Sequence, residues 1–137
     1  MKHRIGQIGP GLVTWGLRVT LGLGIAALPA QAQTAPDPVM GQKQFGQCSV
    51  CHAVDKAKPD GVGPNLYGVY GSKAATRRAK FAYSTPLKNA KLTWDDATLD
   101  KWITDPAVLV PGTKMHFMGL PRKPARANVI AYLKTLK

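Results

Sequence analysis

The chain has 137 residues and carries 19 basic against seven acidic side chains, which gives a formal net charge of +12 at pH 7. This length allows one small domain and excludes a second large one within the chain. A charge this positive favours acidic partner proteins or an anionic membrane surface.

Residues 1–32 have the pattern of a secretory signal. Basic residues come first, and an apolar run of ten residues follows at 19–28. The sequence Ala30-Gln31-Ala32 then gives the small-x-small pattern that a signal peptidase accepts. We therefore predict cleavage after Ala32, which leaves a domain over residues 33–137.

The alternative for this segment is a membrane anchor that stays attached. Residues 12–28 carry no charged side chain apart from Arg18, but 17 residues are at the short limit for a membrane span. Cleavage and export to the periplasm are therefore favoured. The first 32 residues hold three of the 19 basic side chains and no acid, so residues 33–137 carry a formal charge of +9. A periplasmic address argues against nucleic acid as the partner of this basic domain.

The first expected helix begins at Asp37-Pro38, which is typical of a helix N-cap followed by proline at the first helical position. It should run through Met40 and Phe45 to the motif Cys48-Ser49-Val50-Cys51-His52. One helical turn would bring both thiols and the imidazole onto one side of the backbone.

This motif is the pattern of covalent haem attachment. The two thiols add across the two vinyl groups of the porphyrin, and the adjacent imidazole becomes an axial ligand of the iron. The alternatives are a disulfide, a zinc half-site or a redox dithiol. However, the chain has only two cysteines, whereas a structural zinc site collects four ligands. The motif therefore predicts one haem c, bound through Cys48 and Cys51 with His52 on the iron.

The rest of the chain is expected to be helical with long connections. Residues 56–78 contain glycines, prolines and polar residues without a sustained period, which predicts a loop. A loop this long needs something to wrap around, and a haem would serve. The sequence Thr93-Trp94-Asp95-Asp96 resembles a capping box, and apolar residues at helical spacing follow it until Pro106 ends the helix.

A last helix is expected from Pro124, because an apolar stripe follows it at helical spacing. The stripe consists of Val129, Ile130, Leu133 and Leu136. No segment has the alternating pattern of a strand, and we therefore predict an all-α domain.

A second axial ligand would close the far side of the iron. The candidates in residues 33–137 are Met40, Met115, Met118 and His116. Met115 has the most informative context, because a proline and a glycine precede it and can turn a loop that presents its thioether to the iron. Met118 is predicted to be a packing residue and His116 a surface residue.

The motifs together resemble class I cytochrome c, most closely the mitochondrial and alphaproteobacterial long-loop type. The similarity covers residues 37–136, with P-G-T-K-M at 111–115 and G-P-N-L-Y-G at 63–68 as its most specific parts. The resemblance implies a small all-α fold around one haem c. It also implies Met115 as the distal ligand and a Pro64 carbonyl that accepts the far ring N–H of His52.

The resemblance assigns further residues to the haem. It implies that Tyr83, Ser84 and Trp94 hold a propionate, that Trp102 lies beside the methionine sulfur, and that Phe117 lies near the exposed haem edge. The chain also departs from the family. Ser72 stands where animal and fungal proteins carry an arginine near a propionate, and Leu87 replaces an asparagine near the sulfur.

The function that the resemblance implies is carriage of one electron by a monomer that is not an enzyme. The expected partners are acidic docking faces of a quinol-oxidising cytochrome bc complex and of a terminal oxidase or photosynthetic reaction centre, with transient contact to the membrane surface. Two alternatives stay open: an electron acceptor dedicated to a periplasmic dehydrogenase, and a haem-based enzyme or gas sensor with an open iron site. A ring of basic residues should surround the haem edge; its expected members are Lys43, Lys88, Lys91, Lys114, Lys123, Arg77 and Arg78.

Overall fold

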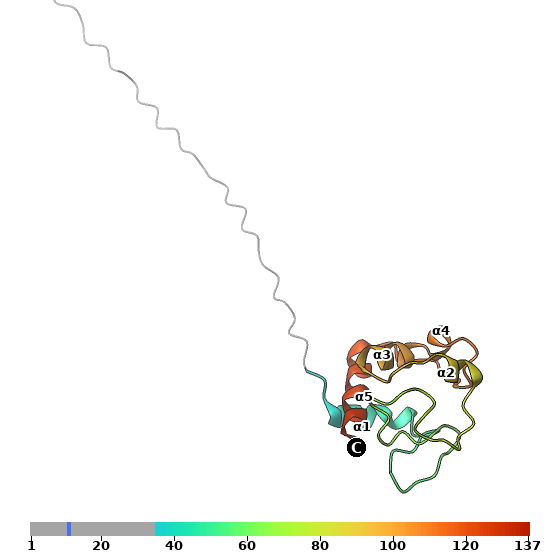
Figure 1. Ribbon diagram of the computed structural model, residues 1–137. Helices are drawn as coiled ribbons and strands as arrows, with labels where there is room; N and C mark the ends of the chain where they lie inside the picture. Colours follow the sequence, from blue (N-terminus) through green and yellow to red (C-terminus); the bar gives the residue numbers. More distant parts are fainter. Residues whose placement is uncertain (1–10, 12–34) are drawn as a thin grey trace, which may run out of the picture. The chain divides into compact units, whose positions relative to one another are not determined.

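The computed structural model describes residues 11 and 35–137 (Figure 1). The predicted signal segment, its cleavage site and the alternative anchor therefore lie outside the described residues, apart from Gly11. Within the part that is described, no helix has both the length and the apolar character needed to cross a membrane.

The described part is helical. The helices are α1 (Pro38–Gln44), α2 (Thr85–Asn89), α3 (Asp96–Thr104), α4 (Pro106–Leu109) and α5 (Lys123–Thr135), with a 3-10 turn η1 (Phe45–Gln47) directly after α1. An isolated bridge pairs Lys73 with Thr93, and residues 35–137 contain no strand. The all-α prediction is confirmed.

Helices α1 and α5 pack across each other and position the start of the site (Figure 1). The Asp37 carboxylate caps α1 by accepting from the backbone N–H groups of the first turn. The Asp37 N–H in turn donates to Oδ1 of Asn128 on α5, at 2.8 Å. Phe45 meets the ring of Tyr132 edge to face, with 5.5 Å between the ring centroids. The Cys48–His52 segment follows this crossing directly.

The start of α3 differs from the expected capping box. Asp95, rather than Thr93, is the N-cap, and its carboxylate accepts from the backbone N–H of Thr98 at 2.8 Å. Thr93 is held instead in the bridge to Lys73. Because α3 begins at Asp96, Thr93 lies three residues before the first helical residue, which is too early in the chain for its hydroxyl to cap the helix.

Pro106 both follows one helix and begins another. Helix α3 ends at Thr104, before Pro106 as expected, but α4 begins at Pro106. The Asp105 carboxylate caps α4 by accepting from the N–H groups of Ala107 and Val108. The short helices α2 and α4 were not expected from the sequence.

The predicted loop over 56–78 is free of helix, and side chains fix its course. Asn65 is only 3% exposed, and its Nδ2 donates to the carbonyls of Asp55 and Lys58 at 2.7 and 2.8 Å. Asp60 accepts from the Asn65 N–H at 2.8 Å and forms an ion pair with Arg78 at 2.7 Å. These contacts join the two halves of the loop.

Arg126 is a buried cation that ties α5 to α3 and to the segment before α5. Its Nε donates to Oδ1 of Asp100 at 2.7 Å. Its Nη1 donates to the carbonyls of Leu120 and Pro121, both at 2.9 Å. The Arg126 side chain is only 9% exposed, whereas the Asp100 side chain is 35% exposed, so the buried Leu120 is the partner with the least access to water if Arg126 is removed.

Replacing Arg126 by methionine should lower the free energy of unfolding by about 2–3 kcal/mol, because the change leaves two carbonyls and a carboxylate without their donor. Lys134→Met is the matched control, since its ion pair with Asp96 is 41% and 61% exposed on its two sides. That variant should lose less than about 1 kcal/mol. Urea unfolding of both proteins measures the difference, and equal losses would contradict the structural role of Arg126.

Candidate haem-attachment site

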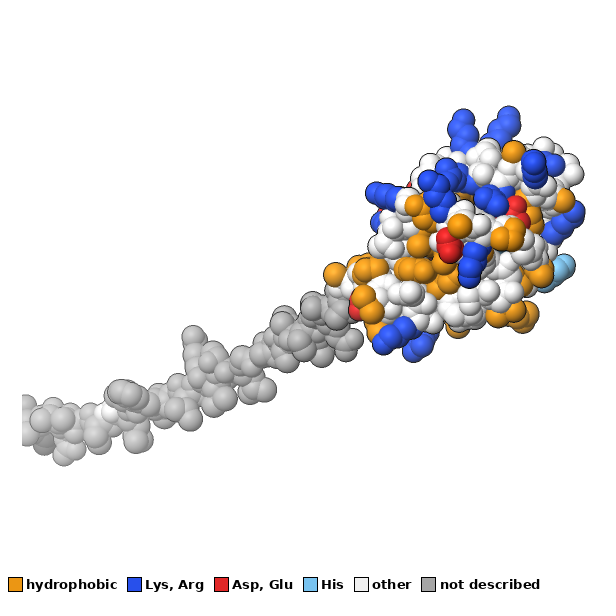
Figure 2. All heavy atoms as spheres, turned by 90° about the horizontal axis from the view of Figure 1, so that it is seen from below, with side chains coloured by type: hydrophobic (Ala, Val, Ile, Leu, Met, Phe, Trp, Pro, Cys, Tyr) orange, Lys and Arg blue, Asp and Glu red, His pale blue; other side chains and the backbone are white. Residues whose placement is uncertain are grey.

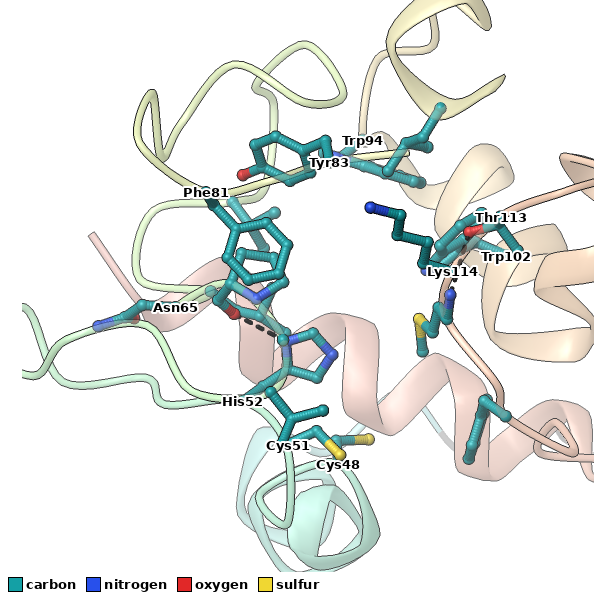
Figure 3. Close-up of a pocket in the computed structure, with 18 of the residues that line it drawn as sticks. Cys48, Cys51, His52, Asn65, Phe81, Tyr83, Trp94, Trp102, Thr113 and Lys114 are labelled. Carbon is teal, nitrogen blue, oxygen red and sulfur yellow. Dashed lines mark hydrogen bonds between the residues drawn. The ribbon is translucent and has the colours of Figure 1, made fainter. Parts of the chain in front are cut away.

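A cavity of about 640 Å³ opens in the described unit between η1, the long loop, α3, α5 and the segment before α5 (Figure 3). Its walls are mostly apolar. All ten residues that the sequence assigned to the haem line this one cavity: Cys48, Cys51, His52, Pro64, Tyr83, Ser84, Trp94, Trp102, Met115 and Phe117.

The attachment motif forms one turn at the edge of the cavity. The N–H groups of Cys51 and His52 both donate to the Cys48 carbonyl, at 3.1 and 3.0 Å. This turn brings the two cysteine side chains close together beside the imidazole (Figure 3). Burial, and to a lesser degree the neighbouring Cys51, raises the pKa of the Cys48 thiol to about 11. Before haem attachment the thiol is therefore protonated at neutral pH.

The His52 ring is oriented by the chain opposite it. Its Nδ1 lies 2.7 Å from the Pro64 carbonyl oxygen, which is the contact expected from the sequence. This bond fixes the hydrogen on Nδ1 and leaves the Nε2 lone pair for a metal ion. Burial lowers the pKa of His52, while the bond to Pro64 opposes that shift.

Gly63 allows the backbone to pass directly against this imidazole. A Cβ atom at residue 63 would lie 2.4 Å from Cε1 of His52, which is closer than such atoms approach. The Gly63 N–H also donates to the Cys51 carbonyl at 2.9 Å. A side chain at residue 63 would therefore push the ring out of place.

The 113–117 segment lies across the open space from His52, where Figure 3 labels Thr113 and Lys114. Met115 is half-buried, and its N–H donates to Oγ1 of Thr113 at 3.3 Å. Nζ of Lys114 lies 3.5 Å from the Ala82 carbonyl, so this side chain reaches toward the 81–84 segment. The sequence had indicated no structural role for Thr113, although this residue belongs to the P-G-T-K-M motif.

The other candidate iron ligands differ in exposure and in whether they line the cavity. His116 is exposed, as predicted, but also lines the cavity. Met40 does not line it. Met118 is fully exposed, so the prediction that it packs in the interior was wrong. The segment after Met115 follows the protein surface before turning inward at Leu120, which leaves the Met118 side chain in solvent.

Aromatic and polar side chains of residues 83–102 form another part of the cavity wall. Trp94 and Trp102 are buried with their ring centroids 5.2 Å apart. Ser84 is 5% exposed and caps α2 by accepting from the Leu87 N–H at 3.4 Å. Burial is the largest cause of a raised pKa at Tyr83. Leu87 itself is buried and lines the cavity, so its departure from the family adds apolar surface there.

The donor set fits a haem better than the alternatives. A histidine nitrogen and a methionine sulfur are ligands typical of haem iron in electron-transfer proteins, and apolar walls suit a porphyrin. Within residues 11 and 35–137, no group of three or more His, Cys, Asp or Glu side chains could hold a metal ion. The zinc half-site therefore finds no support in the described part of the chain.

Comparison with known proteins gives a consistent result. The sequence model of the cytochrome c family matches residues 39–137. The chain is 51% identical over 106 residues to cytochrome c2 of Rhodomicrobium vannielii, which covers 77% of this chain and 84% of that protein. It is 48% identical over 103 residues to cytochrome c2 of Rhodoblastus acidophilus, covering 75% of this chain and 95% of the relative.

A solved structure supports the fold. Cytochrome cH from Methylobacterium extorquens superimposes with a TM-score of 0.69 at 44% identity, and the match covers 72% of this chain and 98% of that one. The matching family and the Cys48-x-x-Cys51-His52 spacing assign one covalently attached haem c to the chain. The protein is therefore a class I cytochrome c, a member of the cytochrome c family.

Proposed function

We propose that this haem c electron carrier works in the periplasm, after cleavage behind Ala32, with its iron held by His52 and Met115. We further propose that it carries single electrons from a quinol-oxidising cytochrome bc complex to a terminal oxidase or photosynthetic reaction centre. The observation that carries this proposal is the cavity itself, whose apolar walls include an oriented imidazole and, across from it, the segment that contains a thioether.

The haem, when bound, supplies the Fe(III)/Fe(II) couple. The chain tunes this couple in three ways. The Met115 thioether is a soft ligand that favours reduced iron. The apolar walls disfavour the extra positive charge of oxidised iron. The Pro64 carbonyl holds the His52 ring in one orientation, so that the ligand geometry stays the same in both oxidation states.

The surface supports docking to acidic partners. On the face shown in Figure 2, hydrophobic side chains gather over the middle of the unit and Lys and Arg side chains project around them. Lys73, Arg77 and Lys114 line the cavity and are exposed. Charged rims of this kind speed and orient an encounter more than they tighten it, which suits partners that separate quickly.

The proposed partners can be tested by stopped-flow reduction of the oxidised protein. Reduction by purified cytochrome bc complex should be fast, and should slow about tenfold or more between low salt and roughly 0.3 M salt as the charges are screened. A periplasmic alcohol dehydrogenase with its substrate is the competing donor. Faster reduction by the dehydrogenase, or a rate that does not change with salt, would contradict the proposal.

A matched pair of variants locates the docking face. Lys114→Gln removes a charge at the cavity, whereas Lys101→Gln removes one from α3 at a position outside the cavity lining. The first should slow reduction by the bc complex several times more than the second. Equal effects would indicate a general charge effect instead of a docking face.

A further inference from the structure

Two neighbouring arginines, Arg77 and Arg78, have different surroundings. Nε of Arg78 forms an ion pair with Oδ1 of Asp60 at 2.7 Å, and the Arg78 side chain is 33% exposed. Its charge is therefore matched within the protein. Arg77 forms no ion pair with any carboxylate in residues 35–137.

Arg77 differs from Arg78 in its position relative to the cavity. Arg77 is the one arginine of the described residues that lines it. Its Nη2 donates to the Tyr67 carbonyl at 3.2 Å, which leaves the remaining N–H donors of the fork for another acceptor. Tyr83, which the resemblance places at a propionate, lines the same cavity.

Gly68 makes room for this position. A Cβ atom at residue 68 would lie 2.5 Å from Nη2 of Arg77 and 3.1 Å from its Cζ. The φ angle of Gly68 is +68°, a conformation that favours glycine. The Tyr67 carbonyl and the bare Gly68 backbone together form a seat for the guanidinium, between Leu66 and Val69, which line the cavity.

The neighbouring Ser72 does not compete for this role. Its hydroxyl donates to the Val69 carbonyl at 2.7 Å, within its own turn, and Ser72 does not line the cavity. The other cations at the cavity are lysines, Lys73 and Lys114. A guanidinium differs from both because its planar fork can donate two parallel hydrogen bonds to one carboxylate.

We propose that Arg77 donates to a propionate carboxylate of the bound haem and, by offsetting its negative charge, raises the reduction potential. The inference rests on the haem site and deepens the proposed carrier function. A propionate at the edge of an apolar cavity is stabilised by a cation and by hydrogen-bond donors, and the exposed, unmatched guanidinium of Arg77 offers both. Because a free propionate charge would stabilise oxidised iron, pairing it with Arg77 favours reduced iron.

The test is an optical redox titration of the purified holoprotein and its variants between about pH 5 and pH 9. In Arg77→Gln, the ratio of oxidised to reduced protein at a fixed solution potential should rise roughly threefold to tenfold at neutral pH, as expected for the loss of one nearby charge. The potential should also fall more steeply with rising pH, because a propionate without its cation takes up a proton more readily. Arg77→Lys should restore most of the ratio.

Arg78→Gln is the matched control, since it removes the same charge from the next residue. It should change the ratio less than twofold, because Arg78 is already paired with Asp60. Gly68→Ala tests the seat without removing any charge: its Cβ should displace the guanidinium and change the ratio in the direction of Arg77→Gln. This variant decides the question if Arg77→Gln fails to accumulate as holoprotein.

Two results would overturn the role of Arg77. One is an unchanged potential and pH profile in Arg77→Gln and Gly68→Ala; the other is an equal shift in Arg78→Gln. Neither would affect the carrier function, which is judged separately from the far-red absorption of the methionine–iron bond in the same samples. Loss of that band in the unmodified protein would instead contradict the proposed ligation.

Discussion

Gly41→Ala is expected to lower the free energy of unfolding by about 3 kcal/mol or more. A Cβ atom on Gly41 would lie 1.9 Å from the Asn128 carbonyl oxygen and 2.9 Å from Cβ of Tyr132. The nearest of these atoms belong to the backbone of α5, which cannot turn aside as a flexible side chain can. Helices α1 and α5 would therefore have to separate, and the segment that carries Cys48 would move with α1. Denaturant unfolding of the holoprotein measures the loss.

Gly46→Ala provides the control for this prediction. Gly46 lies in η1, only five residues further along, and a Cβ atom there would meet nothing within 4 Å. Alanine at this position restricts the unfolded chain and should leave stability unchanged or raise it by up to about 1 kcal/mol. If both variants lost the same stability, the close helix crossing would not be the cause.

Met115→Ala is expected to open the distal side of the iron. The unmodified oxidised protein should show the weak far-red band of a methionine–Fe(III) bond, and the variant should lack it. The reduced variant should bind carbon monoxide rapidly at neutral pH. Its reduction potential should fall by on the order of 0.2 V, well within the range of about 0.8 V over which axial ligands set haem potentials.

Met118→Ala is the matched control, because Met118 is three residues away and fully exposed. It should keep the far-red band and the potential of the unmodified protein. His116→Ala in the Met115→Ala background shows whether the neighbouring imidazole then ligates the iron. A far-red band that survives Met115→Ala would disprove the proposed ligand.

The three longer helical regions could be predicted because each has a local cause. An aspartate before a proline begins α1, and an apolar stripe marks α3 and α5. Helices α2 and α4 have only five and four residues, too few for a stripe to show. Both nevertheless begin with a capping side chain and an early proline. At Asp105-Pro106 this signal was interpreted only as the end of the preceding helix.

The candidate site was predicted mainly by resemblance, since spacing alone points to Cys48, Cys51 and His52. The sequence could not show which hydrogen-bond or ion-pair partners the remaining polar groups have. Arg77 and Arg78 are chemically identical neighbours, yet Arg78 meets the Asp60 carboxylate and Arg77 meets the Tyr67 carbonyl. Which arginine pairs with a carboxylate depends on where the folded loop places Asp60. No local sequence pattern gives that position.

The apolar walls of the cavity also affect how long the protein survives in the cell. Some of the most deeply buried apolar residues, including Phe45, Leu99, Val129 and Leu133, face the haem space. The prosthetic group thus serves as the middle of the hydrophobic core, and the surrounding chain is a shell around it. A molecule that misses attachment would lack this centre and open to proteases. Thioether formation would therefore also act as quality control, because only finished molecules would persist long enough to meet a redox partner.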